Sequence, residues 1–164
     1  MYALSEEPDA RAMLVAEVRR FTRTHLDAAA SERAGRIPRE VLSGLAELGL
    51  FGLALPIEVG GAGLSLTDAC AVIEELARWD RSVATCVGLH TGLGTRALVT
   101  SARPDVAREW LPRLATGEIL GAFAATEACA GSDLMAMRTT ARFEGDTIVL
   151  DGEKSYVTNG GLAG

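Results

Sequence analysis

The first two-thirds of the chain alternate apolar and polar residues at the spacing of amphipathic helices. From Pro8 to Leu26, apolar side chains recur every three or four positions, with charged residues on the opposite face. The same spacing, together with helix-starting prolines or a Ser/Thr cap, predicts three further helices, at residues 38–49, 65–77 and 104–114. Residues 82–101 are almost all small or apolar, which is typical of a helix buried on most sides.

The pattern changes after Gly117. Residues 119–125 form a short apolar run that is typical of a buried strand. Short runs separated by glycine-containing turns predict three more strands, at residues 139–143, 147–150 and 155–158. We therefore expect an α+β chain, with an all-helical domain at residues 1–117 and the first strands of an incomplete β-barrel or sandwich at residues 118–164. So few strands leave edges and a face uncovered, and we expect a partner to cover them.

Composition and charge narrow the classes of function. A hydrophobic fraction of 48% over 164 residues argues against disorder. The formal net charge is −6 and the arginines are scattered, which argues against a nucleic-acid partner. No apolar run approaches the ~18 residues of a membrane span, and the acidic residues near the start do not fit a signal peptide. Three cysteines without a CxxC pair and two distant histidines favour a cytoplasmic protein without a metal site.

The densest cluster of candidate chemistry follows the first predicted strand. Residues 126–133 read Thr-Glu-Ala-Cys-Ala-Gly-Ser-Asp, and we call them the small-residue loop. Small residues let backbone approach a ligand closely and offer N–H groups to an anion, although such residues are also common in ordinary turns. Glu127 and Asp133 fit either an acid–base pair or turn caps. Cys129 has no histidine nearby in the sequence to activate it as a nucleophile.

Three further features admit a functional and a structural interpretation. His90 lies within the apolar segment, where it is either a hydrogen-bonded core histidine or part of a pocket lining. The glycine cluster at 60–63 lacks the GxGxxG spacing and indicates a turn rather than a dinucleotide site. Tyr156 and Thr158 lie two positions apart on a predicted strand, so they share a face and fit the two sides of a planar ligand.

Four ordered motifs resemble those of the acyl-CoA dehydrogenase family. Residues 123–134 are similar to its flavin-binding signature, which is an aromatic, two small residues and then T-E-P-G-A-G-S-D. Residues 152–160 resemble its motif G-x-K-x-[WF]-I-T-N-G. Residues 55–65 are similar to its loop P-x-x-x-G-G-x-G-x-S, and residues 110–118 to the linker before its β domain. Together the matches cover the whole chain.

The sequence departs from the family pattern at two places. Ala128 and Cys129 stand where Pro-Gly is usual, and Tyr156 stands where Trp or Phe is usual. If the backbone at Cys129 needs a positive φ, this substitution costs of order 1 kcal/mol.

The resemblance implies a helical domain, a central β domain and a C-terminal four-helix domain, of which this chain holds the first and the start of the second. It also implies FAD as cofactor. Thr126 would contact the isoalloxazine edge, and Ser132 the pyrophosphate or the carrier arm of an acyl thioester. Tyr156 would pack against the ring and Thr158 would hydrogen-bond near N5. The implied flavin contacts are Phe123, Ala125, Thr126, Gly131, Ser132, Tyr156 and Thr158, and the implied substrate contacts are Ser132 and His90, whose neighbours would face the acyl pocket.

The reaction that the resemblance implies is α,β-dehydrogenation of an acyl thioester carried by coenzyme A or by acyl carrier protein. In the family, the glutamate base lies downstream of residue 164, so no catalytic residue is assigned to this chain. A companion chain is expected to supply that base and the rest of the flavin site, in an oligomer. Two alternatives stay open: a non-catalytic module that binds an acyl chain or its carrier, and a flavin-dependent oxidase or monooxygenase on the same fold.

Overall fold

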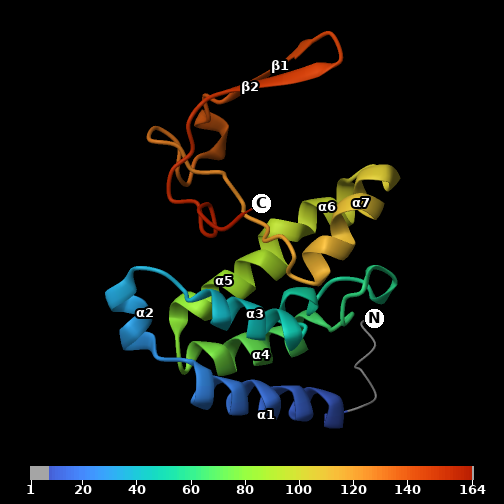
Figure 1. Ribbon diagram of the computed structural model, residues 1–164. Coiled ribbons are helices and arrows are strands. Elements are labelled where there is room, and N and C mark those ends of the chain that lie inside the picture. Colours follow the sequence, from blue (N-terminus) through green and yellow to red (C-terminus); the bar gives the residue numbers. More distant parts are fainter. Residues whose placement is uncertain (1–7, 164) are drawn as a thin grey trace.

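The computed structural model describes residues 8–163, with side chains from residue 11 onward, and shows helices followed by a short hairpin (Figure 1). The α-helices are α1 (Pro8–His25), α2 (Ala28–Ala34), α3 (Arg39–Glu47), α4 (Leu66–Ala77), α5 (Arg81–Leu89), α6 (Thr95–Ser101) and α7 (Pro104–Ala115). The hairpin consists of β1 (Thr140–Glu144) and β2 (Thr147–Asp151). The shorter turns are η1 (Leu50–Gly52), η2 (Ile57–Val59), η3 (His90–Gly94) and η4 (Leu134–Ala136). The predicted α+β class is confirmed.

The core lies between α1, α3, α4 and α5. Each of these helices contributes a wholly buried side chain: Val18, Leu45, Leu76 and Val87. Caps set the starts of two of them, because Ser65 Oγ accepts the Asp68 N–H at 3.1 Å and Asp80 accepts the N–H groups of Ser82 and Val83 at 2.8 and 3.1 Å. In the part of the chain that the structure describes, no helix is both long and apolar enough to cross a membrane.

The helices predicted from apolar spacing are present as α1, α3, α4 and α7. Segment 82–101 is not one regular helix, because the π-helical turn η3 separates α5 from α6. Helix α2 is absent from the prediction because none of its side chains is buried, so it leaves no apolar stripe in the sequence. It is instead stabilised at its two ends, by the Asp27 cap and by Gly35 at φ 64°.

Two of the predicted strands are wrong. Residues 119–125 have no neighbouring strand among the described residues, and side chains from elsewhere bond Gly121 instead. Residues 155–158 do not form a strand because Tyr156 has φ 56°, and Asn159 just beyond has φ 64°. An apolar or β-branched run indicates burial, whereas a strand also needs a partner backbone and an extended φ throughout.

The hairpin confirms the other two predicted strands. Its strands are antiparallel, and Gly145 adopts φ 63° in the connecting turn. Phe143 lies opposite Ile148, and Leu150 lies on the same face because side chains alternate along a strand. These three side chains are 80%, 57% and 72% exposed. Figure 1 shows the hairpin projecting away from the helices. The three exposed side chains therefore form an open apolar face.

Candidate functional site

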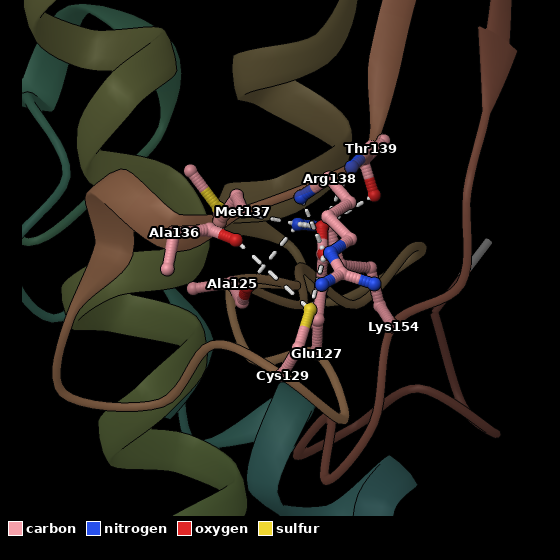
Figure 2. Close-up of polar contacts among 8 residues, drawn as sticks. All are labelled: Ala125, Glu127, Cys129, Ala136, Met137, Arg138, Thr139 and Lys154. Atoms are coloured by element: carbon pink, nitrogen blue, oxygen red, sulfur yellow. Dashed lines mark hydrogen bonds and ion pairs between the residues drawn. The ribbon is translucent and has the colours of Figure 1, made fainter.

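The small-residue loop is fixed at Glu127, whose side chain is buried (Figure 2). One carboxylate oxygen accepts the Arg138 N–H at 2.7 Å. The other accepts the Thr139 N–H at 3.0 Å, the Thr139 hydroxyl at 2.6 Å and Lys154 Nζ at 2.8 Å. We call this group the Glu127 cluster. It joins three segments that the sequence separates by up to 27 positions.

The charge state of Glu127 follows from these contacts. The Lys154 ammonium, followed by the Thr139 hydroxyl and the Arg138 amide, holds the pKa of Glu127 well below its usual range. Lys154 also donates to the Ala125 carbonyl oxygen at 3.1 Å. A carboxylate that is this strongly stabilised as the anion is a weak base. Glu127 is therefore a structural anion, and it does not fit the role of an acid–base partner.

Backbone bonds complete the loop. The Glu127 N–H donates to the Ala130 oxygen at 2.8 Å, and the Ala130 N–H returns to Glu127 at 3.1 Å. The Ser155 N–H donates to the Thr126 oxygen at 2.9 Å, which joins the loop to the motif that follows β2. Asp133 accepts the Met135 N–H at 3.0 Å, so it caps η4. The turn-cap interpretation therefore holds for Asp133.

Cys129 fits this loop without backbone strain. Tyr156 and Asn159 are the only non-glycine residues with positive φ among residues 8–163, so Cys129 does not need the left-handed region. Its exposed thiol lies 3.9 Å from both Glu127 and the Ala136 oxygen (Figure 2). The cost foreseen for a cysteine at this position is therefore absent.

The residues predicted to contact a flavin lie around this loop. Phe123 and Tyr156 present aromatic rings that are 43% and 94% exposed. Ala125, Thr126 and Thr158 are partly buried, and Gly131 and Ser132 are exposed. In the described chain, the N–H groups of Gly131 and Ser132 have no backbone acceptor. Such free N–H groups suit an anion. Contact of these residues with a ligand stays a prediction.

His90 lies in the core rather than on a surface. It is wholly buried, and its ring meets Phe51 edge-on with the centroids 5.1 Å apart. Nδ1 accepts the Gly121 N–H at 2.8 Å, so the proton sits on Nε2, which donates to the Leu114 oxygen at 3.1 Å. Burial lowers the pKa of His90, which keeps the ring neutral. Both nitrogens bond backbone, and a substrate contact by His90 itself stays a prediction.

Asn159 is a site residue that the sequence reasoning did not single out. Its buried amide Nδ2 donates to the Cys86 oxygen at 3.0 Å and to the Gly121 oxygen at 3.2 Å. It therefore ties the turn after β2 to the end of α5. The available signal was the Asn-Gly pair at 159–160, because Asn tolerates the left-handed conformation that this turn uses.

An apolar groove is lined by residues of α4, α5 and η3. Its lining is Ile73, Ala77, Arg81, Ala84, Thr85, Gly88, Leu89, Gly92 and Leu93. The two glycines keep it open: a Cβ on Gly88 would meet Ile73 only at 3.6 Å, and one on Gly92 would meet nothing within 4 Å. The groove thus has room for an aliphatic chain.

The cysteines lie apart from one another and are free. Cys70 and Cys129 are exposed and Cys86 is buried. Burial raises the pKa of the Cys86 thiol to about 11. Across the described residues, no group of three or more His, Cys, Asp or Glu side chains is placed to hold a metal ion.

Comparison with known families matches both parts of the chain. Residues 8–118 match the family model for the acyl-CoA dehydrogenase N-terminal domain, and residues 122–164 match the model for its middle domain. The chain belongs to the acyl-CoA dehydrogenase family. The small-residue loop is the part of this acyl-CoA dehydrogenase chain that carries the flavin signature by resemblance, and the structure places it next to the motif at 152–160.

Individual relatives agree with this assignment. The very long-chain specific acyl-CoA dehydrogenase of Bos taurus mitochondria is 36% identical over 152 residues, which cover 92% of this chain and 23% of the relative. Butyryl-CoA dehydrogenase from Megasphaera elsdenii is 28% identical with a TM-score of 0.87, over 99% of this chain and 43% of that one. An acyl-CoA dehydrogenase from Bacillus anthracis, solved with FAD, is 29% identical with a TM-score of 0.83. The match covers 99% of this chain and 28% of that one. The chain thus spans less than half the length of each.

Proposed function

We propose that this chain supplies the helical domain and a flavin-contacting segment of an FAD-dependent acyl-CoA dehydrogenase. The observation that carries the proposal is the Glu127 cluster. It fixes the small-residue loop against the segment that holds Lys154, and so brings the two predicted flavin motifs together. A domain boundary near Gly117 stays part of this proposal.

FAD fits the residues around the loop. Phe123 and Tyr156 offer exposed aromatic surface, as a tricyclic ring requires. The free N–H groups of Gly131 and Ser132 suit the negative charge of a pyrophosphate. When bound, the flavin supplies the hydride acceptor of the reaction.

The chain's own residues orient and shield the reactants. The hydroxyls of Thr126 and Thr158 would hold the edge of the ring system by hydrogen bonds. Ser132 bonds either the pyrophosphate or the thioester's carrier arm. The groove lined by Gly88 and Gly92 would hold the acyl chain.

The base that removes the α-proton comes from another polypeptide segment in this proposal. Glu127 is excluded because its carboxylate accepts four hydrogen bonds and its pKa is depressed. The exposed apolar face of Phe143, Ile148 and Leu150 supports the presence of further strands that cover it. We infer that a companion chain, or a longer form of this chain, supplies those strands and the base. A cytoplasmic oligomer remains the prediction from the sequence.

The proposal is tested by producing the chain with FAD, both alone and with a polypeptide that completes the β domain. The native mass and the absorption spectrum are measured on the same sample, and acyl-CoA is then added without oxygen. We expect a yellow complex whose flavin absorbance bleaches. Acyl-CoA binding by a colourless complex would support the non-catalytic alternative instead. Oxygen consumption with every turnover would favour the oxidase.

A further inference from the structure

The backbone N–H and the carbonyl oxygen of Gly121 are each hydrogen-bonded by a side chain from a distant part of the chain. Its N–H donates to His90 Nδ1 at 2.8 Å, and its oxygen accepts Asn159 Nδ2 at 3.2 Å. These partners lie 31 and 38 positions away in the sequence. Asn159 also bonds the Cys86 oxygen at the end of α5. We call the three residues His90, Gly121 and Asn159 the Gly121 junction.

One member of the junction lies in the turn that also lines the groove. His90 is the first residue of η3, and the groove is lined by its neighbours Leu89, Gly92 and Leu93. π-Helical turns of this kind often occur at functional sites because they turn side chains away from the regular helical spacing. The same turn therefore supplies groove lining on its outer side and a buried imidazole on its inner side.

The junction is joined to the small-residue loop on the other side. Ala125 lies only four positions after Gly121, and its oxygen accepts a hydrogen bond from Lys154 of the Glu127 cluster. A stretch this short spans at most roughly 14 Å, and both of its ends are fixed. A displacement of Gly121 would therefore move Phe123 and pull on Ala125, which adjoins the small-residue loop.

We propose that His90 and Asn159 are positioning residues: by bonding the Gly121 peptide, they set the small-residue loop at a fixed place relative to the acyl groove. This inference rests on the proposed function, in which the loop contacts the flavin and the groove takes the acyl chain. His90 acts through Gly121 and not on the substrate, because both of its ring nitrogens bond backbone.

Two substitutions of His90 separate its two hydrogen bonds. The His90→Asn side chain places an oxygen near the position of Nδ1, so it keeps an acceptor for Gly121 and loses the bond to Leu114. The His90→Gln side chain reaches the position of Nε2, so it keeps a donor for Leu114 and loses the bond to Gly121. Both remove the ring, and we expect similar losses of thermal stability.

Flavin binding distinguishes the two variants. In the complete flavin-containing assembly, we expect the FAD dissociation constant to rise about tenfold in His90→Gln and less than about threefold in His90→Asn. The shift in the visible flavin spectrum on adding acyl-CoA should shrink in the first variant only. Asn159→Asp keeps the left-handed turn but removes the donor, and should behave like His90→Gln. Asn159→Asp also serves if His90→Gln does not fold.

The possible results distinguish a failure of the positioning role from a failure of the proposed function. A wild-type assembly without flavin contradicts the proposed function. A wild-type assembly with flavin, but with equal FAD affinity and equal spectral shifts in His90→Gln and His90→Asn, overturns the positioning role alone. Hydrogen exchange of the Gly121 amide gives an independent measurement. The junction is supported if this amide stays protected in His90→Asn and loses protection in His90→Gln. Equal protection of the amide in both variants contradicts it.

Discussion

Gly94 and Gly121 lie against each other through their backbones: a Cβ built on either would stand 3.0 Å from the other's carbonyl group. Gly94 ends the π-helical turn, and Gly121 belongs to the segment that leads to the small-residue loop. The contact has no side chain between its two backbones. It lets the helices and the loop segment approach closely enough for His90 to reach the Gly121 N–H.

This packing makes Gly94→Ala destabilising. Gly94 has helical φ −65° and ψ −30°, so alanine gains about 1 kcal/mol of helix propensity there. The added methyl group meets backbone that cannot move aside freely, at a cost of roughly 1–3 kcal/mol. We expect a net loss of about 1 kcal/mol in urea unfolding. Gly92→Ala, where nothing lies within 4 Å, is the control and should gain up to ~1 kcal/mol. Equal stability of the two variants would contradict the close contact.

Glu127→Gln is expected to loosen the small-residue loop. The amide keeps the shape of the side chain, but it turns one acceptor into a donor facing Lys154, Thr139 or the Arg138 amide. We expect FAD affinity of the complete assembly to fall roughly tenfold, measured by flavin fluorescence titration. Glu144→Gln is the control, because Glu144 is exposed on the hairpin and pairs with Arg142, away from the Glu127 cluster. Unchanged FAD affinity in Glu127→Gln would show that the loop does not need this cluster.

Stability should fall in acid because of the Glu75 carboxylate. Arg19 donates two hydrogen bonds to it at 2.9 Å and lowers the pKa of the buried Glu75 to about 2. The folded pKa lies below the ordinary value of 4.5, so this stabilisation is complete above pH 4.5 and is lost as the pH falls towards 2.

Glu75→Gln tests that pH dependence. We expect it to lose about 1–2 kcal/mol at neutral pH, a modest value because Arg19 is half exposed. The difference from wild type should shrink between pH 4.5 and 2. A difference in unfolding free energy that stays constant over this range would argue against a depressed Glu75 pKa.

Gly92→Leu should shorten the acyl chain that the groove accepts. The space beside Gly92 is open, so the larger side chain fits the protein and occupies the groove. In the complete flavin-containing assembly, we expect the KM for long-chain acyl thioesters to rise about tenfold. The KM for short-chain thioesters should change little. Gly92→Ala controls for backbone effects. Equal losses for short and long substrates would place the acyl chain elsewhere.

The three thiols should differ in reactivity. Cys70 and Cys129 are exposed, whereas Cys86 is 2% exposed and its pKa is raised to about 11 by burial. A thiol reagent such as DTNB should therefore modify two thiols in the native protein and the third only after unfolding in urea. Rapid modification of Cys86 in the folded state would contradict its burial.

Local spacing along the chain was enough to predict several parts of the fold. The apolar stripe of α1, a Ser or Thr cap at the start of α4 and the Gly145 turn of the hairpin are each properties of a few neighbouring residues. The four ordered motifs also identified the family before any contact was known. Side-chain spacing within one element is enough to predict that element.

The tertiary structure alone decided which distant residues meet. The sequence left His90 open between core and pocket, did not single out Asn159, and left Glu127 open between an acid–base partner and a turn cap. His90 and Asn159 meet at Gly121, and Glu127 meets Lys154, which lies 27 positions away. Segment 119–125 is apolar like a strand, yet its polar backbone groups at Gly121 bond side chains instead of a neighbouring strand. Hydrogen-bond partners across such separations depend on how the helices and loops pack, and local periodicity carries no information about that.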